Sequence, residues 1–228
     1  MHHFILPTQD SWISSGSSTI TGETFRDQNF GGDEILQLKK VFQNNSFDYQ
    51  TQALINFAGT DFTSLSQSVS SGDIPSSAEY YLRLFEAEGA SELSEEYKLS
   101  AHPLWKSWVE GAGKSEDNPK NTNGVSWENR NDILNGNQIS WSYTDGVKDL
   151  AIPGDLDLNG LSFNEYHVTF QNASQTFSDV SASNFLGGND SDDRGGVWVN
   201  RPGYIASQSF SSQATDVEMD VTDMVNKW

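Results

Sequence analysis

The stretch EYYLRLFEAE, residues 79–88, is the clearest indication of the fold. Successive side chains of a β-strand point to opposite faces of the sheet, so residues two apart share a face. Both sets are bulky here: Tyr80, Leu82 and Leu84 on one face, and Tyr81, Arg83 and Phe85 on the other. Because neither face is polar throughout, we predict a central strand that packs on both sides.

Similar short runs, rich in aromatic and β-branched residues, recur along the chain and are separated by Gly, Ser, Asn, Asp and Thr. This spacing is typical of an all-β sandwich or barrel. The other predicted strands are residues 3–6, 10–14, 34–41, 51–57, 95–102, 139–143, 166–170, 204–210 and 216–220. Two short helices are expected, at 60–69 and 222–228, and neither has the apolar stripe of a core layer.

The length of 228 residues suits one large all-β domain or two small ones. No internal repeat and no clean linker is visible, so we predict a single domain over residues 1–228. A division near residue 145 is the less favoured alternative. The chain contains no cysteine, which excludes disulfides, thiolate metal sites and a cysteine nucleophile.

The charge is strongly acidic, with 32 Asp and Glu against 13 Lys and Arg and a net charge of −19. Such a charge repels nucleic acid and anionic membranes, so we expect neither as a partner. No apolar run is long enough to span a bilayer. Divalent cations would suit the surface, but a solvated acidic surface is the simpler interpretation.

Trp108 and Trp127 lie on either side of a polar loop, residues 111–123. Flat aromatic rings can stack on sugars, so the pair is a candidate glycan-binding site. The alternative is that both indoles anchor the ends of the loop in the core, with their N–H groups bonded to loop carbonyls. From the spacing alone we favour the second interpretation.

Asp155, Asp157 and Asn159 precede Gly160 in the pattern D-x-D-x-N-G, which matches the first half of a calcium-binding loop. The twelfth position of that loop would normally be Glu, but Tyr166 stands there. The leucines between the three polar residues also suit an alternating strand, which we favour. Calcium is therefore the one candidate cofactor, and not the expected outcome.

No motif for catalysis is present. None of the four histidines belongs to an H-E-x-x-H sequence, and neither a G-x-S-x-G nor a phosphate-binding P-loop sequence occurs. With 32 acidic residues some carboxylate pair will always exist, so a pair is no argument for glycosidase chemistry. We predict that the protein is not an enzyme.

Seven segments in order give a resemblance to a known family. They are DSWIS (10–14), FRDQNFGGDEILQLKK (25–40), ALINF (53–57), DIPSSAEYYLRLFEAE (73–88), SWVEG (107–111), VSWENR (125–130) and DVEMDVTDMVNKW (216–228). Together they resemble the DNRLRE-domain family. The resemblance implies a jelly-roll-type β-sandwich, related to carbohydrate-binding modules, with long polar loops and a short C-terminal helix. Residues 147–207 stand apart as an inserted or diverged stretch.

The form SWVEGAGKSEDNPKNTNGVSW, residues 107–127, is similar to virion structural proteins of T4-like marine bacteriophages. This resemblance implies a non-enzymatic part of the virion, on the tail, the baseplate or the head. Its partners would be other virion proteins or further copies of itself. The alternative is a carbohydrate-binding module that recognises a polysaccharide.

One departure from the family pattern concerns the end of the chain. In the family the chain continues past D-V-T-x-x-V-x-x-W into at least one more strand, whereas this sequence ends at Trp228. We expect either that a further segment of the natural protein is missing or that a neighbouring subunit supplies the strand by β-augmentation.

Overall fold

A computed structural model describes the chain over residues 3–18, 22–43, 46–87, 96–104, 107–133, 137–141, 186–188, 195–199, 203–211 and 216–226. The chain divides into two compact units whose segments alternate along the sequence. Unit 1 comprises Met1–Ser76, Lys106–Ser142 and Gly188–Val197. Unit 2 comprises Ser77–Trp105, Tyr143–Gly187 and Trp198–Trp228.

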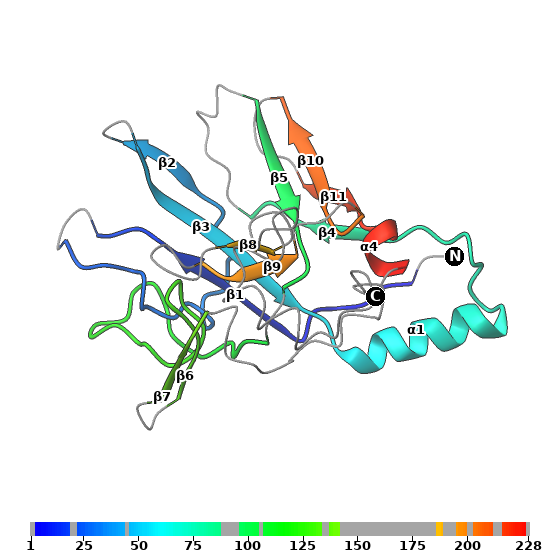
Figure 1. Ribbon diagram of the computed structural model, residues 1–228, viewed down its shortest axis with the longest axis horizontal. Helices are drawn as coiled ribbons and strands as arrows, with labels where there is room; N and C mark the ends of the chain where they lie inside the picture. The colour runs from blue at the N-terminus through cyan, green and yellow to red at the C-terminus, as the bar shows by residue number, and fades with distance from the viewer. Residues whose placement is uncertain are drawn as a thin grey trace, which may run out of the picture. The chain divides into compact units, whose positions relative to one another are not determined.

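Unit 1 is built on a three-stranded antiparallel sheet. Its strands are β1 (Gln9–Ser14), β2 (Lys40–Gln43) and β3 (Ser46–Asn56), and β3 lies between the other two (Figure 1). A hairpin of β6 (Asn129–Ile133) and β7 (Asn137–Ser140) belongs to the same unit. The buried aromatic and aliphatic side chains include Trp12, Ile13, Phe30, Leu54, Val125, Trp127 and Trp141.

Helix α1 (Gly59–Ser71) follows β3, close to the predicted helix at 60–69. It ends at Ser71 and is followed by Gly72, whose φ of 84° places it in the left-handed region that favours glycine. Leu65 is its only buried residue. Because a helix of this kind buries so little apolar surface, it contributes little to the core, as the sequence predicts.

Unit 2 contains two strand pairs, both antiparallel. Strand β4 (Tyr81–Leu84) pairs with β11 (Val217–Asp220), and β5 (Tyr97–Ala101) pairs with β10 (Ala206–Phe210). The short helix α4 (Thr222–Asn226) follows β11 directly (Figure 1). The core of the unit is a cluster of Ala206, Phe210, Val217, Met219 and Met224. The ring of Phe210 stacks on Tyr97, with their centroids 4.7 Å apart.

Two further short strands, β8 (Leu186–Gly188) and β9 (Val197–Val199), pair with each other. The architecture is thus mostly β, with two helices among the described residues, which confirms the predicted class at that level. Over the same residues, no helix combines the length and the apolar character needed to cross a membrane.

Some predicted strands differ from the structure. Residues 3–6 form no strand, and of the predicted strand at 34–41 only its end belongs to β2. The prediction of a central strand at 79–88 is wrong for the described residues, where β4 is shorter and has β11 as its one partner. Its outer face is solvated, since Tyr81 is 46% exposed and Phe85, just beyond the strand, 74%. The predicted strand at 166–170 lies outside the described residues.

Candidate functional site

Two loops of unit 1, residues 24–33 and 107–128, meet around one buried side-chain amide, that of Asn29. The side chain of Asn29 is 0% exposed. Its Nδ2 donates to the carbonyl oxygens of Glu110 (2.6 Å) and Val125 (2.8 Å). Its Oδ1 accepts from the backbone N–H groups of Gly113 (2.8 Å) and Gly31 (3.2 Å). We call the contacts of these two loops the Asn29 interlock.

Glycines allow the two loops to approach so closely. A Cβ atom on Gly124 would lie 2.6 Å from Nδ2 of Asn29, and Gly111 adopts a φ of 79°. A Cβ on Gly111 would collide with the side chain of Asn29 and the carbonyl of Asn123. The backbone also joins the loops directly, because Gly32 N–H donates to the carbonyl of Gly113 at 2.7 Å. Gly111 and Gly124 therefore need to be glycine for space as well as for conformation, since both have positive φ.

Strand β1 is tied to the interlock through an aromatic stack and two carboxylates. The ring of Trp12 lies parallel to Phe30, with their centroids 3.8 Å apart. Trp12 Nε1 donates to Asp33 Oδ2 at 3.0 Å, and Asp33 Oδ1 accepts from Ser115 N–H at 3.0 Å. The N–H of Asp10 donates to Glu110 Oε1 at 2.8 Å. The interlock therefore holds the sheet as well as the loops.

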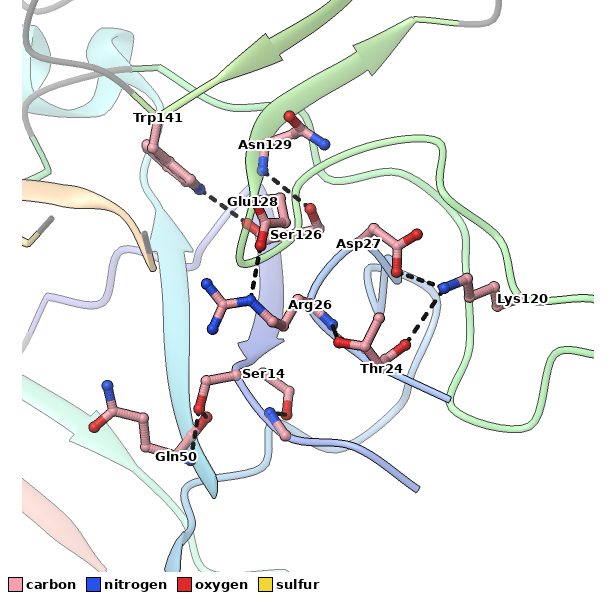
Figure 2. Close-up of polar contacts among 12 residues, drawn as sticks. Ser14, Thr24, Arg26, Asp27, Gln50, Lys120, Ser126, Glu128, Asn129 and Trp141 are labelled. Carbon is pink, nitrogen blue, oxygen red and sulfur yellow. Dashed lines mark hydrogen bonds and ion pairs between the residues drawn. The ribbon is translucent and has the colours of Figure 1, made fainter. Parts of the chain in front are cut away.

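Two ion pairs, drawn in Figure 2, add charged contacts between the same two loops. Arg26 Nε lies 2.7 Å from Glu128 Oε1. Lys120 Nζ lies 2.6 Å from Asp27 Oδ1 and 3.4 Å from the carbonyl of Thr24. All four charged side chains are about one-third exposed. At that exposure each pair contributes roughly 0–1 kcal/mol, so the ion pairs support the interlock but do not create it.

The tryptophans at the ends of the polar loop are buried. Trp108 is 8% exposed and Trp127 1%. Nearby, Trp141 Nε1 donates to the carbonyl of Ser126 at 2.9 Å (Figure 2). This burial agrees with indoles that anchor the loop in the core. A glycan needs an exposed ring face on which to stack, and neither candidate residue presents one.

The candidate calcium ligands Asp155, Asp157 and Asn159 lie outside the described residues. Among the residues that are described, no group of three His, Asp or Glu side chains could hold a metal ion. The carboxylates of the interlock have structural partners instead: Asp33 and Glu110 accept hydrogen bonds, and Asp27 and Glu128 form ion pairs. Chemically the interlock is a rigid polar framework.

Unit 2 offers a second candidate, a hollow of about 290 Å³ between the strand pairs and α4. It is lined by three acidic residues, four apolar residues and one threonine: Glu79, Asp220, Asp223, Ile205, Ala206, Val221, Met224 and Thr222. The hydroxyl and backbone N–H of Thr222 lower the pKa of Asp220. The Tyr81 hydroxyl donates to Glu79 Oε2 at 2.9 Å, and this bond is the main cause of the raised pKa of Tyr81.

Neither Asn29 nor the hollow is predicted from the sequence. Asn29 begins the sequence NFGG, residues 29–32. An Asn directly before a glycine-rich turn is the one sequence feature that points to it. The acidic residues of the hollow carry no recognisable motif, because they come together only when β11 and α4 lie beside residues 79 and 205.

The chain was compared with protein-family models, with curated proteins and with solved structures, and none of the three comparisons found a match.

Proposed function

We propose that the chain is a non-enzymatic structural component of a bacteriophage virion, built as a jelly-roll-type sandwich and acting through assembly contacts. It would belong to the tail, the baseplate or a decorated head. The observation that supports this best is the placement of the seven segments on which the resemblance rests. Each of them is bonded to at least one other, although they are far apart in the sequence.

In unit 1, five of these segments meet. The segment at 53–57 overlaps β3, which pairs with the β1 residues of the segment at 10–14. Asp10 N–H reaches Glu110 of SWVEG, and Asn29 of the long second segment bonds to both Glu110 and Val125. A family pattern that reflects one fold would be expected to have its motifs in contact in this way.

In unit 2, the remaining two segments form the β4–β11 pair. Val217–Asp220 runs antiparallel to Tyr81–Leu84, and Val221 N–H donates to the carbonyl of Tyr80 at 2.8 Å. The order of the motifs in the sequence and their contacts in space therefore support the same assignment.

The nature of the interlock also suits a structural role. Its polar groups bond to one another across the two loops, and this fixes the loops without a ligand. A virion protein must keep its shape in the particle, and buried, fully bonded polar networks give such rigidity. The carbohydrate-binding alternative has no support at Trp108 and Trp127, because both rings are buried.

The solution mass of the purified chain, measured by light scattering with and without calcium, tests the proposal. We expect a defined multiple of the 25.2 kDa chain, or a stable complex with another virion protein. A chain that stays monomeric at every concentration and associates with no virion protein would contradict the assembly role. A calcium-dependent change in mass would direct attention to Asp155, Asp157 and Asn159.

A further inference from the structure

Unit 2 carries the acidic hollow and, on β4 and just beyond it, two exposed aromatic rings. Tyr81 joins the two features, because its ring is 46% exposed and its hydroxyl bonds to Glu79 at the edge of the hollow. Phe85 lies four residues further along the chain, roughly 13 Å away in an extended backbone. We call Glu79, Tyr81, Phe85, Asp220 and Asp223 the acidic aromatic surface.

The hollow has the chemistry that a long basic side chain needs. Its lining includes the buried Ala206 and Met224 and the exposed Ile205, against which methylene groups can pack. The carboxylates of Glu79, Asp220 and Asp223 line the same hollow. Lys and Arg bury an apolar stem and keep the charged end among polar groups, so they match both parts.

The two exposed rings, of which Tyr81 bonds to a residue of the hollow, suit protein recognition. Arg83, between them on β4, is held by an ion pair to Glu218 at 3.2 Å and lies 5.9 Å from the ring centre of Phe85. Tyr, Phe and Arg are the residue types enriched where proteins bind one another. Exposed aromatic faces also attract the cationic groups of a partner.

The charge of the surface indicates which partner fits. With a net charge of −19, a second copy of the chain would bring more negative charge to a surface that is already acidic. Like charges placed opposite each other at an interface disfavour binding, and a partner of opposite charge is both attracted and selected. Charge complementarity therefore favours a basic segment of a different protein.

We propose that the acidic aromatic surface docks a basic segment of a partner protein, with a Lys or Arg side chain in the hollow and the adjacent residues on Tyr81 and Phe85. This inference rests on the proposed assembly role and names the surface and the chemistry of the partner. Binding involves no covalent step.

Two double variants of the full chain test the proposal. Glu79→Gln with Asp223→Asn removes two exposed carboxylates from the hollow. Glu34→Gln with Glu116→Gln removes two exposed carboxylates from unit 1 and changes the net charge equally. The probe is a capped synthetic peptide, Gly-Lys-Leu-Arg-Leu-Lys-Gly, and its affinity is measured by titration calorimetry at low and physiological salt.

We expect the hollow variant to weaken peptide binding about tenfold or more, and the unit 1 variant about twofold or less. Phe85→Ala should also weaken binding, whereas Phe4→Ala, at a similarly exposed phenylalanine, should not. All four side chains of the double variants are exposed, so unfolding curves should stay close to that of the parent chain.

Equal losses in the two double variants would overturn the proposal, because the peptide would then recognise only the overall charge. No measurable binding at either salt concentration would overturn it as well. A glycan-array signal that disappears in Phe85→Ala, without peptide binding, would assign the surface to the carbohydrate-binding alternative. Whichever of these outcomes is found, a defined oligomer or a virion complex in light scattering would still support the assembly role. Only the absence of both the oligomer and the complex would contradict the proposed function.

Discussion

Replacing Asn29 by alanine should destabilise unit 1 far more than any other loop substitution that removes a single amide. The change deletes four hydrogen bonds at once, two donated to carbonyls and two accepted from backbone N–H groups. Those partners belong to three separate stretches of chain, so the loss loosens both loops together.

The magnitude follows from where the four bonds lie. The carbonyl of Val125 and the N–H of Gly113 meet Asn29 in buried surroundings, and the other two contacts are partly buried. A buried polar group that loses its partner costs roughly 1–3 kcal/mol, and a bond that water can replace costs about 0.5–1.5 kcal/mol. We therefore expect Asn29→Ala to lower the free energy of unfolding by about 4 kcal/mol, a large part of the 5–15 kcal/mol typical of whole domains.

Urea denaturation followed by tryptophan fluorescence is the suitable assay. Four of the seven tryptophans, Trp12, Trp108, Trp127 and Trp141, lie in unit 1, so the signal reports mainly on that unit. The matched control is Asn56→Ala, since Asn56 is exposed and its amide donates one bond, to Gln9 Oε1 at 3.1 Å. That control should change stability by no more than about 0.5 kcal/mol.

A second variant separates hydrogen bonding from cavity formation. Asn29→Asp keeps the volume but sets a carboxylate oxygen against the carbonyls of Glu110 and Val125. It should be as destabilising as alanine at neutral pH, and should recover in part as the pH falls, because a protonated carboxyl group can donate again. If Asn29→Ala unfolds within about 0.5 kcal/mol of Asn56→Ala, the interlock is not what holds the loops, and the reasoning fails.

Two other predictions concern a glycine and a carboxylate. Gly111→Ala should destabilise unit 1 by about 2 kcal/mol more than Gly22→Ala, because both residues have positive φ but only Gly111 is surrounded by other atoms. Thermal unfolding of the two variants checks this, and equal losses of stability would contradict it. Thr222→Val should raise the pKa of Asp220 toward its ordinary value whereas Thr222→Ser should not, as read from carboxyl carbon shifts in an NMR titration. Because the folded-state pKa of Asp220 is lowered, its stabilising effect is present above the ordinary carboxyl pKa and is lost as the pH falls through the folded value.

Much of the strand pattern could be predicted from the sequence, because alternation records which face is buried. Strands β1, β10 and β11 lie close to their predicted ranges, and both helices begin within two residues of theirs. The failure at residues 79–88 has a specific cause. Alternation shows that both faces are bulky, but it does not tell a packed face from one that leaves Tyr81 and Phe85 exposed.

The interlock could not be predicted for a different reason. Asn29 contacts Glu110 and Val125 across 81 and 96 residues of sequence, and no periodicity links positions so far apart. Strand β6, with the sequence NRNDI, was not predicted because it lacks the apolar alternation of a half-buried strand. Local rules identify strands, whereas contacts between loops depend on how the whole sheet places them.

The two units differ in how far their acidic groups are exposed, and this difference bears on function. Unit 1 uses its amides and carboxylates internally, so that Asn29, Asp33 and Glu110 bond to backbone or to buried rings. In unit 2, Glu79 and Asp223 are exposed in the lining of the hollow, and the exposed Tyr81 bonds to Glu79. A group that already has good internal partners gains little from a ligand, whereas an exposed carboxylate beside apolar side chains gains both charge pairing and burial. Recognition of a partner should therefore depend on unit 2, and substitutions that disrupt the interlock should affect binding only through the stability of unit 1.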